Sequence, residues 1–333
     1  MISRLLRRLQ GRPTLPGDDD AFPVEGSPCA SSHAPAALTT PDLTHRFVAH
    51  VMGTECGPGN PGVVEEALHH LRMIAGRLDV RRMPRLPALV PQLLADMRRD
   101  DSDAAQLASL LARDPTIAGE VVRVANSAFY QRGQPAGSLQ QAVQRIGHEG
   151  LRHVVLTSVM RPIMRAHPTQ PGHAAAERLW PQVEACTWLC GRLAPGRCDI
   201  GEAQLAGVVA GTGAAALLRM ASVALLTPAA GDPQFADGFM RIARGLTSQA
   251  AEYWQLPEQA RAALSGATPC APLGMVLQSA EALAMGAAML GGAALDMAGI
   301  AAIDVALPRR QEERIALVEA LQRETTREAE ALA

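Results

Sequence analysis

The segment 114–152 has the pattern of two helices joined by a short corner, and it constrains the fold more than any other part of the chain. Asp114 followed by Pro115 is typical of a helix start, because the carboxylate accepts free backbone N–H groups of the first turn and proline has none to lose there. Apolar residues then recur at spacings of four and three, which predicts a helix with one apolar face. These residues are Ile117, Val121 and Val124.

The corner follows where this periodicity stops. Asn126 and Ser127 compete for backbone hydrogen bonds and therefore favour a helix end, and Phe129 and Tyr130 come soon after them. Ser127 has no His and acid partner nearby in the sequence, so we interpret it as a capping or corner residue rather than a nucleophile. The pattern predicts an aromatic corner between two helices.

A second helix is predicted after a turn that contains Gly and Pro. Ser138 and Gln141 have the spacing of a capping box at its start. Ile146 lies on the apolar face of this helix, and Gly147 can supply a left-handed cap at its C-terminal end.

The rest of the chain predicts an all-α fold, because apolar residues recur at helical spacing and few segments alternate between apolar and polar. Hydrophobic residues make up 48% of the chain but aromatic residues only 3%, so the core must be built from small and aliphatic side chains, which favours closely packed helices. Gly211 and Gly213 interrupt the apolar run 203–226. We expect close helix packing there rather than a phosphate loop, since no strand precedes it and no Gly-Lys-Ser/Thr follows.

Both ends of the chain differ from its middle. Residues 1–45 are predicted as a disordered tail, because they are rich in Pro, Gly, Ser and Asp and have no helical period. The basic, amphipathic start of this tail is interpreted as a frayed terminus, with contact to a membrane surface as the alternative. Residues 46–82 are predicted as an N-terminal helical extension. Residues 291–333 are predicted as a C-terminal extension whose amphipathic helix packs back on the domain or pairs with a partner.

An ordered series of short motifs resembles one known family. The motifs are Leu86-Pro87, Asp114-Pro115, Asn126-Ser127 with Phe129-Tyr130, Ile146-Gly147 and Arg152, followed by Trp254, Leu256 and Pro257. The series is similar to that of HDOD proteins, the HD-related output domains of bacterial signalling, which share the helical scaffold of the HD metal phosphohydrolases. The resemblance covers about residues 83–290 and implies an all-α, multi-helix HD-like domain.

The resemblance also implies that the catalytic chemistry is missing. In HD enzymes the helix similar to 205–209 leads into an adjacent His-Asp pair that holds a divalent metal; here the matching positions are Ala210 and Gly211. All nine histidines precede residue 174. Glu281 matches the final Asp of these enzymes, but one isolated carboxylate is more often solvated or ion-paired than catalytic. We therefore expect no catalytic residue, no metal ligand and no cofactor.

The cysteines do not change this expectation. The chain has six, which is too few for a disulfide scaffold of this length. Cys186 and Cys190 lie one helical turn apart without a nearby His, so buried free thiols are favoured over a metal site.

These features predict a noncatalytic, cytoplasmic regulatory protein of bacterial signalling. It would bind a protein partner, or a small ligand in a cleft left from the ancestral active site. The corner at 126–130 is one candidate surface, with plain helix packing as the alternative. The rival function is a divergent metal phosphohydrolase acting on nucleotides or cyclic dinucleotides.

Two further classes of function are disfavoured. The net charge of −2 gives no general attraction to nucleic acid, and no DNA-reading motif is present. The apolar stretch 282–303 is mostly Ala and Gly and contains Asp296, so we expect a buried helical region rather than stable membrane insertion.

Overall fold

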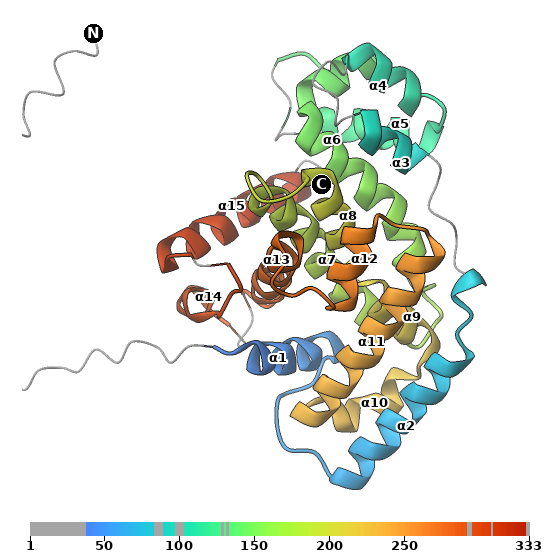
Figure 1. Ribbon diagram of the computed structural model, residues 1–333, viewed down its shortest axis with the longest axis vertical. Helices are drawn as coiled ribbons and strands as arrows, with labels where there is room; N and C mark the ends of the chain where they lie inside the picture. The colour runs from blue at the N-terminus through green and yellow to red at the C-terminus, as the bar shows by residue number, and fades with distance from the viewer. Residues whose placement is uncertain are drawn as a thin grey trace, which may run out of the picture. The chain divides into compact units, whose positions relative to one another are not determined.

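The computed structural model describes residues 38–82, 89–96, 103–127, 130, 133–291, 295–307 and 309–330, all in one compact unit. Within these ranges the chain forms helices and no strands, apart from two isolated bridges (Figure 1). The all-α prediction is confirmed. The predicted tail falls almost entirely in residues 1–37, outside the described part of the chain.

Helices α1 (Thr40–Met52) and α2 (Pro61–Arg77), with the 3-10 turn Val80–Arg82, form the predicted N-terminal extension. Helix α1 begins inside the segment assigned to the tail, because the Thr39 side chain accepts the backbone N–H of Asp42 and caps the helix. Its apolar face packs on α7, α10, α11 and α13. The extension is therefore part of the core.

The motif segment is confirmed as two helices and a corner. The helices of this region are α3 (Leu89–Asp96), α4 (Ala104–Leu111), α5 (Pro115–Ala125) and α6 (Leu139–Met164). Asp114 Oδ1 accepts the backbone N–H groups of Thr116 and Ile117 at 3.0 and 3.2 Å, as expected of a cap. Ser138 Oγ accepts from Gln141 N at 3.2 Å, but Gln141 Oε1 reaches Gly137 N rather than Ser138 N.

Gly147 differs from its prediction in one respect. Its φ is +74°, which favours glycine, but the chain re-enters a helix at once instead of ending there. Helix α6 therefore kinks at Gly147 and continues to Met164. Along its length it contacts α3, α4 and α5 as well as α7, α8 and α9, so it links the motif region to the rest of the fold.

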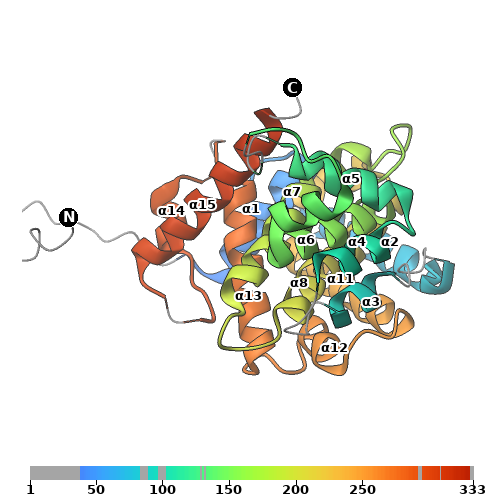
Figure 2. The ribbon, with the colours of Figure 1, turned by 90° about the horizontal axis from the view of Figure 1, so that it is seen from above.

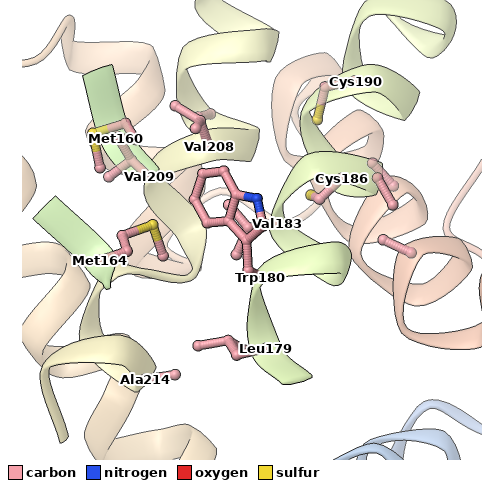
Figure 3. Packing of buried hydrophobic residues seen from close by; sticks show 14 of the residues in the cluster. Met160, Met164, Leu179, Trp180, Val183, Cys186, Cys190, Val208, Val209 and Ala214 are labelled. Atoms are coloured by element: carbon pink, nitrogen blue, oxygen red, sulfur yellow. The ribbon is translucent and has the colours of Figure 1, made fainter. Parts of the chain in front are cut away.

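Helix α7 lies at the centre of the remaining helices and packs most extensively on α8 and α13. These helices are α7 (His173–Leu193), α8 (Ile200–Ala210), α9 (Thr212–Met220), α10 (Val223–Ala230), α11 (Pro233–Tyr253), α12 (Glu258–Ser265) and α13 (Pro272–Ala288). Figure 3 shows Trp180 and Val183 of α7 packed among the side chains of α6 and α8. Small residues allow these helices to approach closely.

Gly213 gives the clearest case of close approach. A Cβ atom at this position would lie 1.8 Å from the carbonyl oxygen of Ala243, so the backbones of α9 and α11 touch there. The predicted helix contact is confirmed. The neighbouring stretch Ile200–Met220 is long and apolar enough to cross a membrane, but most of it is buried inside the protein, as in a core helix.

Helices α14 (Met297–Ala302) and α15 (Gln311–Glu330) form the C-terminal extension. Helix α15 packs on α7, α13 and α14, with Val318 and Leu321 buried, so the predicted amphipathic helix packs back on the domain (Figures 1 and 2). The two extensions meet at Leu38, which donates to Ala302 O at 2.8 Å and accepts from Asp304 N at 3.0 Å.

Candidate functional site

A cavity of about 970 Å³ lies among α1, α7, α11, α12, α13 and the segment after α14. Ala210, Gly211 and Glu281 all line it. The three positions that the family resemblance aligns with metal-binding positions of HD enzymes therefore belong to the lining of one cavity. Helix α1, which precedes the motif region, contributes a wall of this cavity, so the extension and the domain build it together.

Gly211, in the lining of the cavity, has no room for a side chain. A Cβ atom there would lie 2.5 Å from Val183 Cγ2 and 2.9 Å from Met164 Cε, and Figure 3 shows both side chains in the packed core. A carboxylate at this position would need both neighbours to move. In the described part of the chain, no group of three or more His, Cys, Asp or Glu side chains is placed to hold a metal. The residues present do not fit a divalent metal centre.

Thr247 fixes the helix junction beside this position. Its hydroxyl accepts the backbone N–H of Gly213 at 3.0 Å and donates to the carbonyl of Ala210 at 3.2 Å. Both hydrogen-bonding roles of the hydroxyl are thereby used. Thr247 holds the α8–α9 junction in place and has little left to offer a bound molecule.

Among the polar side chains that line the cavity, those of Gln182 and Glu281 remain available. Gln182 of α7 is 5% exposed, and its amide makes no hydrogen bond to any described residue. Glu281 of α13 forms no ion pair within the described ranges; burial raises the pKa of its carboxyl, while the charge of Arg244 opposes that shift. An acceptor that lines a cavity and has no partner in the protein is available to a ligand.

Charged groups concentrate towards the mouth of the cavity. They are Asp42, His45, Asp237, Arg241, Arg244 and Asp304. Arg241 is paired with Asp237 one helical turn away, and His45 Nε2 lies 2.6 Å from the carbonyl oxygen of Gly231. With Glu281, the lining holds four carboxylates and two guanidinium groups, so its charge is acidic on balance.

The motif corner lies elsewhere and is held together by its own side chains. Asn126 Oδ1 accepts the backbone N–H of Ala136 at 2.7 Å and Nη1 of Arg145 at 3.1 Å. Arg145 also donates to the carbonyl oxygens of Ala125 and Gln134 at 3.2 and 2.9 Å. Asn126, one of the candidate interaction residues, therefore has a structural role that ties α5 to the turn before α6.

The neighbouring motif residues are also largely internal. Ser127 is buried. The Tyr130 hydroxyl packs against Gly150, where an added Cβ atom would lie 2.6 Å from the hydroxyl oxygen. Arg152 is buried too, and burial lowers the pKa of its guanidinium while Asp199 and Glu149 oppose that shift. Ile146 is buried beside the kink at Gly147. None of these residues lines the cavity.

The Trp-x-Leu-Pro element forms the turn between α11 and α12. Trp254 caps the end of α11, Leu256 is buried and donates to Ala251 O at 3.0 Å, and Pro257 directly precedes α12. The described candidate residues therefore lie in two places, around the corner between α5 and α6 and in the turn between α11 and α12. Leu86, Pro87 and Phe129 lie outside the described residues.

Cys186 and Cys190 are free and fully buried, as predicted. A hydrogen bond with Cys190 and burial raise the pKa of the Cys186 thiol well above its usual value, so it stays protonated. His153, next to Arg152, is likewise kept uncharged, because burial lowers its pKa to about 4.

Comparisons with known proteins agree with this architecture. The family model of the HDOD domain matches residues 83–267. The fold resembles the crystal structure of an HDOD domain protein with unknown function from Geobacter sulfurreducens, with 17% identity and a TM-score of 0.54 over 78% of this chain and 96% of that one. It also resembles a protein described as a putative phosphohydrolase from Shewanella amazonensis, with 19% identity and a TM-score of 0.50 over 79% and 98%. No curated protein matches the chain.

Proposed function

Because the chain belongs to the HDOD domain family, we propose that it is a noncatalytic regulatory protein of bacterial signal transduction. It acts in the cytoplasm by binding a protein partner or a small ligand, and it does not transform what it binds. The family membership rests on a match that spans more than half of the chain. The role within the family rests on the cavity.

The packing at Gly211 carries the proposal. Hydrolysis by an HD enzyme requires several ligands that hold a metal and lower the pKa of its bound water. In this chain the two adjacent ligand positions are Ala210 and Gly211, and a side chain at Gly211 would overlap Val183. Val183 and Met164 fill the space that a side chain at Gly211 would occupy.

The cavity supports a binding role for the same part of the molecule. A volume of about 970 Å³ is within the range of small-molecule sites, and apolar walls with a few polar groups are typical of such sites. Gln182 and Glu281 offer polar groups that the protein does not itself use. Ligand binding here would act on α1 and α11, which both line the cavity and pack on each other.

The rival function, a divergent metal phosphohydrolase, has less support. The Shewanella amazonensis protein that is described as a putative phosphohydrolase is 19% identical, which relates the two folds only. In this chain the carboxylates at the cavity mouth belong to different elements, and Asp237 is already paired with Arg241. No specific observation favours hydrolysis.

A binding experiment with chemical readout tests the proposal. A panel of small molecules is screened for thermal stabilisation of the purified full-length protein, and each molecule that stabilises it is recovered and identified by mass spectrometry. We expect recovery of the unchanged molecule, and loss of stabilisation in Ala210→Leu, which fills the cavity, but not in Ala262→Leu, which lies on α12 outside the lining. Recovery of a hydrolysed product would contradict the proposal.

A further inference from the structure

The inner wall of the cavity brings together two polar groups from neighbouring helices. Gln182 and Cys186 lie one turn apart on α7, and Glu281 of α13 is near enough to Cys186 for its charge to raise the pKa of that thiol. Helices α7 and α13 form one of the most extensive contacts in the fold. Gln182 and Glu281 therefore face the cavity from adjoining helices.

The surfaces around these two groups are apolar. They are formed by side chains from α1, α7 and α13, namely Phe47, Val51, Leu179, Leu277 and Met285. An apolar wall favours contact with a hydrocarbon or aromatic group. It also excludes water from the polar pair, which strengthens any interaction that Glu281 makes with an opposite charge.

Glu281 offers only acceptors when it is charged, and the Gln182 amide can offer its oxygen beside it. Thr247 already uses its hydroxyl, and the backbone N–H of Gly213 is bound to that hydroxyl. Arg241 is paired with Asp237, and Arg244 is exposed, although its charge opposes the rise in the pKa of Glu281. An anion entering the cavity would meet more carboxylates than guanidinium groups. A cation would meet Glu281 and the amide oxygen of Gln182.

We propose that the cavity binds a small organic cation, with a protonated amine held by Glu281 and Gln182 and an apolar body against α1, α7 and α13. This inference rests on the proposed function only in taking the cavity to be a binding site. It adds the chemical class of the ligand. Gln182, which is 5% exposed, lines the cavity and forms no hydrogen bond to a described residue, is the observation that separates this site from a mere cluster of acidic residues.

The chemistry predicts a clear order among probes that share one apolar body. Hexylammonium supplies a positive charge and three N–H donors, whose hydrogen bonds Glu281 and Gln182 can accept. Hexanol supplies one neutral donor. Hexanoate places a second negative charge beside Glu281 without water to screen it. Because hydrogen bonds to charged groups are about twice as strong as neutral ones, we expect hexylammonium to bind at least about tenfold more tightly than hexanol, with hexanoate weakest.

The experiment titrates these three probes into the full-length protein by NMR or calorimetry, near neutral pH and at fixed sodium chloride concentration. Glu281→Gln keeps the size of the side chain and should remove the preference for hexylammonium over hexanol. Gln182→Leu should reduce hexylammonium affinity several-fold and gives a second route if Glu281→Gln does not fold. Glu258→Gln, an exposed carboxylate on α12 outside the lining, should change neither affinity nor preference.

Three results would overturn the inference. The first is a preference for hexanoate, which would make the cavity an anion site that uses Arg244. The second is an unchanged preference in both Glu281→Gln and Gln182→Leu. The third is the absence of binding by all three probes, which would leave the regulatory role with a protein partner intact. Metal-dependent hydrolysis would instead overturn the proposed function itself, so the two failures are distinguishable.

Discussion

Gly211 lies against Val183 so closely that a Cβ atom on Gly211 would be 2.5 Å from Val183 Cγ2. The contact joins the α8–α9 junction to α7, at the position that the family resemblance aligns with a metal ligand of HD enzymes. Val183 is fully buried, and Met164 approaches the same point from α6. The core is packed tightly around Gly211, which leaves no room for a side chain at this position.

This packing predicts that the metal site cannot be restored by simple substitution. We expect the double variant Ala210→His and Gly211→Asp to lose about 1–3 kcal/mol or more of stability, because the new side chain overlaps Val183 and Met164 and buries a charge. Urea denaturation measures the loss, and elemental analysis should find no stoichiometric metal. Gly119→Asp on α5, where nothing lies within 4 Å, is the control. Full stability together with bound metal would contradict the prediction.

The contact at Gly213 predicts opposite effects for two glycines of the same region. Gly213→Ala would place a Cβ atom 1.8 Å from the carbonyl oxygen of Ala243, so α9 and α11 must separate, and we expect a loss of several kcal/mol. Gly245→Ala, in α11 with nothing within 4 Å, should gain up to about 1 kcal/mol from helix propensity. Thermal denaturation compares the two. A similar effect from both would show that the helices do not touch.

Asn126 and Arg145 predict the cost of breaking the motif corner. Asn126→Ala leaves the backbone N–H of Ala136 and the Arg145 guanidinium without their acceptor, which should cost about 1–3 kcal/mol. Asn126→Asp retains an acceptor for both donors and should lose less. Chemical denaturation of the two variants measures the difference. Loss of a protein partner with unchanged stability in Asn126→Ala would instead make the corner an interaction site.

Burial of His153 predicts that the free energy of unfolding decreases as the pH falls. Burial lowers its pKa to about 4 in the folded protein, whereas an unfolded histidine titrates near 6.5. The contribution of neutral His153 to the free energy of unfolding is therefore fully present above about pH 6.5. It is lost as the pH falls towards 4, by at most about 3 kcal/mol.

The matched variant is His153→Gln, which removes the titrating group. Its free energy of unfolding should fall less steeply between about pH 6.5 and 4 than that of the natural protein. Parallel slopes in this interval would show that folding does not lower the pKa of His153.

Much of the fold could be predicted because local signals and packing agree. Asp114 and Pro115 start α5 for reasons that lie within one turn of helix. The helical spacing of Val318 and Leu321 predicts the buried face of α15, but spacing alone does not determine whether that face meets the domain or a partner. Gly147 shows the limit of local reasoning: its positive φ was predictable, but the continuation of α6 beyond it depends on packing against α7 and α8.

The cavity was harder to predict because it is assembled from distant segments. Ala210, Gly211 and Glu281 were selected through the family resemblance, but Gln182 and Thr247 were missed. Gln182 lies in a helix whose other residues read as core, and its one signal was a polar side chain on a face otherwise buried. The role of α1 depends on a contact between the N-terminal extension and α11 and α13, which no local pattern records.

The most direct test of the noncatalytic role is elemental metal analysis of the purified protein, paired with a hydrolysis assay on nucleotides and cyclic dinucleotides with added manganese or magnesium. We predict no stoichiometric metal and no turnover, because Ala210 and Gly211 supply no ligand and Val183 fills the space beside them. Stoichiometric metal with turnover would contradict the proposed role and would require a metal site built from other residues of this chain.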